Sequence, residues 1–124
     1  MDTLVVPDVE ARGLAHGPLA LSPSERDVFV VYDLQLYYEM EGSFFDHVQN
    51  DPEKMNWLED TLIRAGDLGS LGIIRRLREL APDATSEGDK LCAAYDERRQ
   101  FRWECLEHYL SGQGVRLKWN RNDA

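Results

Sequence analysis

The sequence predicts an all-α fold, a compact bundle of about five helices, and three observations favour it. Strong helix starts, in which a capping residue precedes a proline, occur at Ser22-Pro23 and at Asp51-Pro52. Apolar residues after each start recur at spacings that suit helices. The chain has 124 residues, of which 43% are apolar, so one domain can bury a core without disulfides or metals.

The chain divides into three segments: an N-terminal arm (1–21), a helical domain (22–111) and a C-terminal tail (112–124). Prolines and glycines interrupt the arm and no period is sustained in it, so we expect irregular structure there. The alternation of residues 115–119 in the tail predicts a short strand or an extended strap.

The first helix is expected to run from Pro23 to about Met40. Ser22 and Glu25 have the spacing of a capping box, and the proline suits the first helical position. Apolar residues surround the axis of this helix instead of forming one stripe. A helix that is apolar all round is buried, so this one should be central.

Two further helices follow Gly42, which interrupts the pattern. Ser43 can cap a short helix over residues 44–49. Asp51 then caps a third helix, which Gly66 ends.

Asp67 can cap a fourth helix that ends near Ala81, and a long fifth helix should cover about residues 87–110. Arg98 and Arg102 fall on the apolar face of that fifth helix. An arginine there must reach water or meet a carboxylate, so we expect bridges to the acid-rich half of the chain. An anion site at the two arginines is the alternative.

The cysteines, Cys92 and Cys105, lie on this same predicted helix, about 20 Å apart at 1.5 Å per residue. A disulfide needs Cα atoms within about 7 Å, so both should be free thiols. Free thiols and an acidic N-terminus favour the cytoplasm, and no apolar run is long enough for a membrane span.

Charge is distributed unevenly along the chain, whose net charge is −9. Residues 1–67 hold 14 acids and 4 bases, whereas residues 68–124 hold 9 acids and 10 bases. The acidic half would repel phosphates, which argues against direct nucleic-acid binding and favours a basic protein as partner. Internal pairing of the two halves is the alternative, and a second copy of the chain is a further candidate partner.

The candidate binding surface combines acids of the first half with one aromatic anchor. Trp57 lies among acids on the face of the third helix opposite its core stripe, as an interface anchor within a polar rim does. Its alternative role is to pack under the N-terminal arm. The acids of this surface are Glu39, Glu41, Asp46, Asp51, Glu53, Glu59, Asp60 and Asp67.

Catalytic patterns are missing from the sequence: there is no phosphate loop, no nucleophile elbow and no zinc-protease pair. Cys105 and His108 are three residues apart, but one such pair is too little for a zinc site. We therefore expect neither an enzyme nor a cofactor or metal.

The stretch from Leu21 to about Leu80 resembles the bacterial DNA mimic protein 19 domain family. The resemblance rests on Gly42–Asn50 (Gly-Ser-Phe-Phe-Asp-His-Val-Gln-Asn), where Ser43 stands at the second glycine of the family's turn motif, and on the helix end from Leu58 to Gly66. It implies an all-helical fold with an acidic face, and a protein that occupies the DNA site of a transcription factor.

The function that we expect is therefore a non-enzymatic inhibitor or regulator that presents carboxylates to a nucleic-acid-binding protein. An immunity protein or antitoxin that neutralises a basic toxin is the alternative. A small enzyme is a third class, which would require a pocket with perturbed titratable groups.

Overall fold

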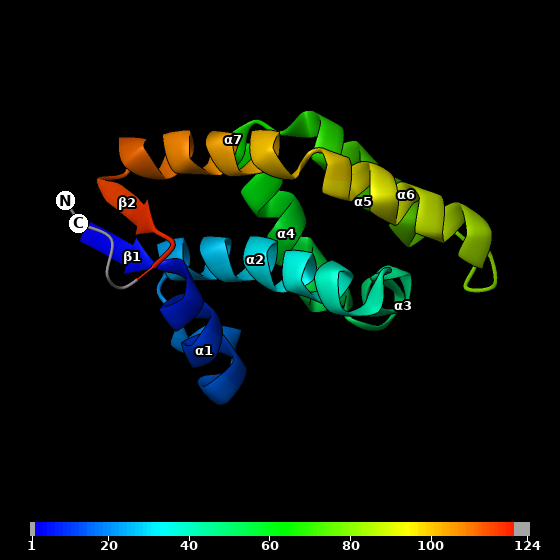
Figure 1. The fold of residues 1–124 in the computed structure, drawn as a ribbon, viewed down its shortest axis with the longest axis horizontal. Helices are drawn as coiled ribbons and strands as arrows, with labels where there is room; N and C mark the ends of the chain where they lie inside the picture. Colours follow the sequence, from blue (N-terminus) through cyan, green and yellow to red (C-terminus); the bar gives the residue numbers. More distant parts are fainter. Residues whose placement is uncertain (1, 121–124) are drawn as a thin grey trace.

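The structure is a computed structural model that describes residues 2–120, most of which are helical (Figure 1). An all-α bundle is thus confirmed, although the described residues form seven α-helices. The elements are β1 (Asp2–Val5), α1 (Val6–His16), the 3-10 turn η1 (Pro18–Ala20), α2 (Pro23–Glu41), α3 (Phe45–Asn50), α4 (Pro52–Ala65), α5 (Leu68–Glu79), α6 (Thr85–Glu97), α7 (Arg99–Gly112) and β2 (Val115–Lys118).

Helix α2 is the central element, as predicted, and runs across the middle of the molecule between α1 and α7 (Figure 1). The capping box is present: the Ser22 hydroxyl accepts the Glu25 N–H at 3.2 Å, and the Glu25 carboxylate accepts the Ser22 N–H at 3.0 Å. Residues 28–31 and Leu34 are all buried, which follows from helices packing on several sides of α2.

The helix ends that the sequence predicts around α4 and α5 are confirmed. Asp51 accepts the Lys54 N–H at 3.1 Å and so caps α4, and Asp67 accepts the Ser70 N–H at 3.1 Å and so caps α5. Gly66 ends α4 in the left-handed region, with φ at 81°. These devices lie within three residues of the groups that they satisfy, which is why the sequence reveals them.

The prediction of an irregular N-terminal arm is wrong, because residues 6–16 form helix α1 against α2. Its buried residues are Val6, Val9, Glu10 and Gly13, which have helical spacing. A search for apolar residues misses this spacing because it does not count Gly13, although Gly13 has a packing role. A Cβ at this position would lie 2.4 Å from the ring of Phe29, so glycine allows α1 to approach α2.

The two ends of the chain form one parallel sheet, in which β1 pairs with β2 from Asp2↔Val115 to Val5↔Lys118. The strand predicted in the tail is therefore confirmed, and its partner lies in the segment that we expected to be irregular. Trp119 follows β2 and packs edge-on against Trp103, with ring centroids 4.6 Å apart.

The predicted fifth helix is two helices, α6 and α7, which meet at Arg98 with φ −90° and ψ 7°. The Tyr95 carbonyl accepts the Arg98 N–H at 3.1 Å and the Arg102 Nη1 at 2.8 Å. A side chain from the next helix thus satisfies a carbonyl at the break. Neither glycine nor proline marks this position, so the sequence carries no local sign of it.

The break places Cys92 on α6 and Cys105 on α7, and both are free thiols. The prediction of free thiols is confirmed, although the single helix on which their separation was based does not exist. Among the helices of residues 2–120, none combines the length and the apolar character that a bilayer crossing requires.

Candidate functional site

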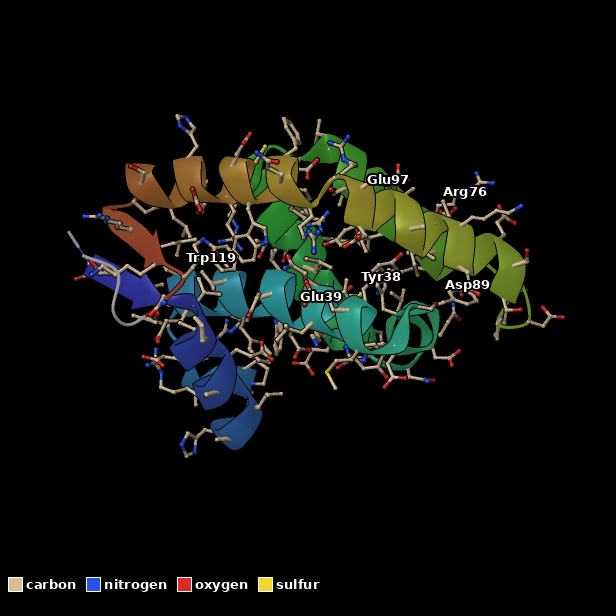
Figure 2. All side chains as sticks on the ribbon, viewed as in Figure 1. Tyr38, Glu39, Arg76, Asp89, Glu97 and Trp119 are labelled. Carbon is tan, nitrogen blue, oxygen red and sulfur yellow. The ribbon has the colours of Figure 1, made fainter. Side chains whose placement is uncertain are left out.

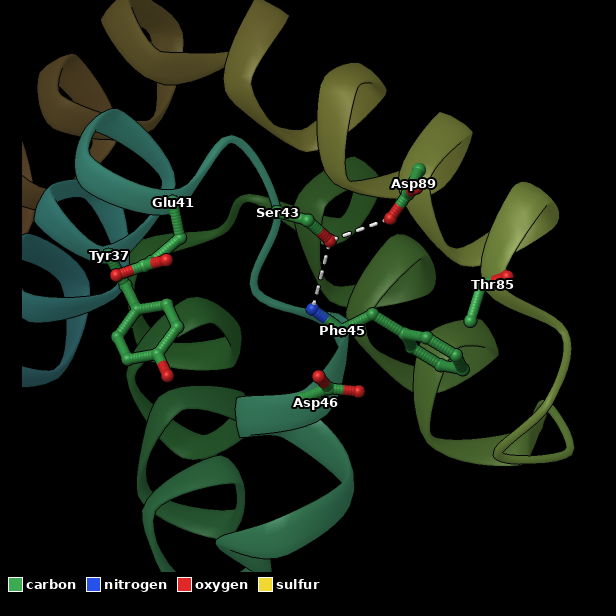
Figure 3. A pocket seen from close by; sticks show the side chains of 7 residues that line it. All are labelled: Tyr37, Glu41, Ser43, Phe45, Asp46, Thr85 and Asp89. Carbon is green, nitrogen blue, oxygen red and sulfur yellow. Dashed lines mark hydrogen bonds between the residues drawn. The ribbon is translucent and has the colours of Figure 1, made fainter.

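A pocket of about 260 Å³ lies where the end of α2 and the start of α3 meet α6 (Figure 3). Three carboxylates, two hydroxyl side chains and two aromatic rings surround it. The lining residues are Tyr37, Glu41, Ser43, Phe45, Asp46, Thr85 and Asp89.

Local structure explains how residues of α2 and α3 reach this pocket. Tyr37 and Glu41 are four residues apart on α2 and so share one face of the helix. Gly42 then turns the chain in the left-handed region, with φ at 74°. Asp46 projects from the first turn of α3, on the far side of this turn.

Ser43 joins the α2–α3 connection to α6. Its hydroxyl donates to Asp89 Oδ1 at 2.8 Å and accepts the Phe45 N–H at 3.4 Å, as the dashed lines in Figure 3 show. Gly88 makes the closeness of α6 possible, because a Cβ there would lie 2.6 Å from the Phe45 ring. Specific contacts therefore hold α3 and α6 together at the pocket.

The carboxylates of Glu41, Asp46 and Asp89 have no lysine or arginine among the residues that line the pocket. His47 stacks on Tyr37, with ring centroids 4.7 Å apart. Burial, and then the charge of Lys54 at 2.9 Å, lower the pKa of His47 below its ordinary value. His47 is thus neutral at neutral pH and adds no positive charge to balance the pocket.

No three His, Cys, Asp or Glu side chains of residues 2–120 are grouped so that they could hold a metal ion. The pocket carboxylates accordingly surround a space instead of converging on one point. Such a spread of negative charge suits an extended cationic group, such as a guanidinium or an ammonium on a long side chain.

The structure divides the predicted acids into three kinds, of which the first is paired with arginines of the second half. Glu39 meets Arg99 at 3.0 Å, and Glu59 meets Arg75 at 2.8 Å and also Arg78. The alternative that we left open, internal pairing of the two halves, is therefore realised at Glu39 and Glu59.

Asp67 is the extreme case of such pairing, because its side chain is fully buried and lies 2.6 Å from Arg98. The prediction that Asp67 faces a partner is wrong. Its role in capping α5 places its carboxylate inside the fold, where Ser70 and Arg98 both donate to it. Burial alone would raise the pKa of Asp67, but those donors lower it below its usual value.

Asp51 is the second kind of acid, which serves local structure, and the predicted aromatic anchor Trp57 is also held within the fold. The Asp51 side chain accepts the N–H at the start of α4. Trp57 is half-buried beneath the guanidinium of Arg26, 5.3 Å from the ring centroid. Arg26 also donates to the carbonyls of Pro18 and Leu21, so it links Trp57 to the N-terminal segment, and Trp57 is not a free anchor on an outer face.

The third kind is exposed and forms no ion pair within residues 2–120: Glu41, Asp46, Glu53 and Asp60. The first two line the pocket, and the other two lie on the outer face of α4. Met40, next to Glu41, is 80% exposed and adds an apolar side chain at the end of α2.

Sequence reasoning identified Glu41 and Asp46 but missed the other five residues that line this site, which are Tyr37, Ser43, Phe45, Thr85 and Asp89. Asp89 meets Ser43 across 46 residues of sequence, and only the packing of α6 against α3 brings the two together. No local signal could have identified this contact.

The bridge expected at Arg98 is confirmed by its ion pair with Asp67, whereas the bridge expected at Arg102 is wrong. The Arg102 guanidinium is buried and stacks on the Tyr95 ring at 3.6 Å, with no carboxylate partner in the described residues.

The two glycines of α5 differ in their surroundings. Gly69 lies against Arg98, where a Cβ would be 2.4 Å from the guanidinium carbon, while the space beside Gly72 is open.

A further buried charge cluster lies between α1, α2 and α4. Glu10 is buried and faces Asp33, which forms an ion pair with Lys54. Burial, and then the neighbouring Asp33 carboxyl group, raise the pKa of Glu10 to about 9. Glu10 therefore keeps its proton at neutral pH.

Comparisons with protein-family models, with curated proteins and with solved structures gave no match to this chain. The resemblance to the DNA mimic family therefore stays a prediction.

Proposed function

We propose that this protein is a non-enzymatic binding protein whose acidic pocket receives basic side chains of a protein partner. The single observation that carries the proposal is the pocket itself. Glu41, Asp46 and Asp89 surround a space of about 260 Å³ that no lysine or arginine lines, in a fold whose other acids are often bridged.

The composition of the rim supports a macromolecular partner. Met40 and Tyr37 are exposed apolar groups beside these acids, and interfaces combine such anchors with a charged rim. A basic side chain that enters between the carboxylates would form charge-assisted hydrogen bonds with them.

The partner class that we propose is a nucleic-acid-binding protein, whose basic site the acids would occupy in place of phosphates. Duplex DNA presents one charge per about 1.7 Å of axis, and a protein built to meet that array also attracts an ordered array of carboxylates. The exposed acids of the neighbouring α4 face, Glu53 and Asp60, extend the negative charge beyond the pocket.

Capture of proteins from a cell lysate on the immobilised chain, with duplex DNA as competitor, tests this proposal. We expect basic proteins to be retained at low salt, released as salt rises, and displaced by DNA. The Glu41→Gln/Asp46→Asn variant should lose them. Glu97→Gln is a control that removes a single charge outside the pocket, because Figure 2 places Glu97 at the far end of α6 from Asp89.

Retention that does not change with salt, or that survives the double substitution, would contradict binding through the acidic pocket. Retention that depends on the pocket but resists duplex DNA would leave the pocket as the binding site and reject DNA mimicry.

A further inference from the structure

Strand β2 has one paired edge and one unpaired edge. The Gly114 carbonyl accepts the Asp2 N–H at 2.9 Å, so the backbone of Gly114 points toward β1. Because successive residues of a strand direct their backbone groups to opposite edges, Arg116 also points toward β1. Val115 and Leu117 point away from it, and no hydrogen bond from residues 2–120 meets their outward N–H and C=O groups.

A groove of about 350 Å³ runs along this unpaired edge. Its lining residues are Glu107 and Ser111 of α7 and Val115, Arg116 and Leu117 of β2. Figure 1 shows β2 between β1 and the end of α7. An edge of this kind is a template for one more strand.

The side chains beside the edge differ in character on the two faces of the sheet. Val115 is buried and Leu117 half-buried, so their face is apolar. Arg116 points to the opposite face, is exposed, and forms no ion pair within the described part of the chain. Glu107 of α7 also lines the groove, so Arg116 is its one basic lining residue and Glu107 its one acidic lining residue.

Charge argues against a second copy of the chain as the added strand. The symmetric antiparallel pairing that satisfies the outward groups sets Val115 opposite Leu117 and Arg116 opposite Arg116 of the second copy. Like charges directly opposite each other destabilise a strand pair.

We propose that the free edge of β2 binds an extended segment of another protein in which acidic residues alternate with apolar ones. The acids of this segment lie on the Arg116 face, and its apolar residues lie beside Val115 and Leu117. The backbone groups of Val115 and Leu117 supply the hydrogen bonds, and Arg116 selects the charge. This surface is separate from the acidic pocket, so either proposal can fail without the other.

Two synthetic peptides test the proposal on the full chain: acetyl-Thr-Val-Glu-Val-Glu-Val-Thr-amide and the same peptide with lysine at both glutamates. The readout is amide hydrogen exchange by NMR. We expect the acidic peptide to slow exchange at Val115 and Leu117 at least about tenfold, while Arg116, already bonded to β1, serves as the internal control. The acidic peptide should bind about three- to tenfold more tightly than the basic one.

Arg116→Glu should reverse the order of the two peptides, and Arg116→Gln should bring them within about twofold. Both substitutions are at an exposed side chain, so the fold should survive them. Failure of both peptides to protect Val115 and Leu117 would overturn the proposal, as would equal binding by wild-type protein. Protection that rises with protein concentration alone would instead identify a second copy as the occupant.

Discussion

Asp67 and Asp46 belong to the same acid-rich half of the chain, yet they occupy opposite environments. Asp67 is fully buried, accepts hydrogen bonds from Ser70 and lies 2.6 Å from Arg98. Asp46 is exposed and lines a pocket that contains two other carboxylates and no base. The contrast teaches that a count of charges along a sequence cannot separate acids that hold the fold from acids that face a partner.

The pairing of acids also follows the architecture. The bridges of Glu39, Glu59 and Asp67 all reach arginines on α5 or at the α6–α7 junction and the start of α7, which pack beside α2 and α4. The acids at the turn between α2 and α3 face α6, which contributes another acid, Asp89, and no base to the pocket. Negative charge therefore remains uncompensated at that junction.

Removal of the buried acid should give the largest effect. Asp67→Ala deletes the α5 cap and leaves Arg98 without its partner, so we expect a loss of about 3 kcal/mol in the free energy of unfolding. Arg98 is 35% exposed and can turn toward water, which keeps the loss below that of a fully buried pair. Urea denaturation at pH 7 measures it.

Asp60→Ala is the matched control, because Asp60 is exposed and has no ion-pair partner in the described residues. It should change the free energy of unfolding by less than about 0.5 kcal/mol. If Asp67→Ala and Asp60→Ala lowered the free energy of unfolding equally, the distinction between buried and exposed acids would be contradicted.

Glu10 sharpens the comparison, since it is a buried acid that meets another carboxyl group and not a cation. Its pKa, raised to about 9 in the folded protein, lies above its unfolded value of 4.5. The folded state therefore holds an extra proton between these limits, and stability falls as pH rises through this range. Glu10→Gln should remove that dependence and stabilise the protein by on the order of 2 kcal/mol at pH 7.

The free energy of unfolding, measured by urea denaturation at several pH values from about 5 to about 9, would reveal this change, because that range lies between the unfolded and folded pKa values of Glu10. Asp33→Asn provides the contrast, because it deprives Lys54 of its carboxylate and should destabilise the protein. A Glu10→Gln variant whose stability keeps the wild-type slope with pH would show that Glu10 is not the group that holds the proton.

A smaller effect is expected at Glu59, whose two arginine partners are both partly exposed. Burial alone would raise the pKa of Glu59, but the hydrogen bonds from Arg75 and Arg78 lower it. The stabilisation is thus present at neutral pH and is lost as pH falls through the lowered pKa. Glu59→Gln should cost about 1 kcal/mol at pH 7 and little at pH values low enough to protonate the carboxylate.

The test for Glu59 is the difference between wild-type and variant unfolding free energies, measured at neutral and at acid pH. Glu53→Gln, at an exposed acid of the same helix, should show no such difference. A loss at Glu59 that persists unchanged in acid would point to packing and not to the charge.

What the sequence could predict was mostly local. Ser22, Asp51 and Asp67 each cap a helix through a group three residues away, and all three are found as predicted. Helix α1 escaped prediction because Glu10 and Gly13 occupy buried positions that a search for apolar residues passes over. The break at Arg98 escaped it because neither glycine nor proline marks it, and the Arg102 guanidinium satisfies the Tyr95 carbonyl there.

The candidate site could be predicted only in part for the same reason. Glu41 and Asp46 were identified from the charge of their segment, and both line the pocket. Asp89 completes the pocket through a contact between segments far apart in sequence. Likewise, Glu39 and Glu59 are paired within the chain, and so are not free to meet a partner, because tertiary packing brings arginines within reach of them.

The smallest effect should occur at the pocket acids themselves. Glu41→Gln/Asp46→Asn removes two exposed charges that no ion pair uses, so stability should stay within about 0.5 kcal/mol of wild type. Any change should be a gain at low ionic strength, because the substitutions relieve repulsion that salt otherwise screens. Urea denaturation at low and high salt measures both quantities, with Glu53→Gln/Asp60→Asn as the control of equal charge. A loss of more than about 1 kcal/mol would place these carboxylates among the groups that hold the fold, and the contrast with Asp67 would disappear.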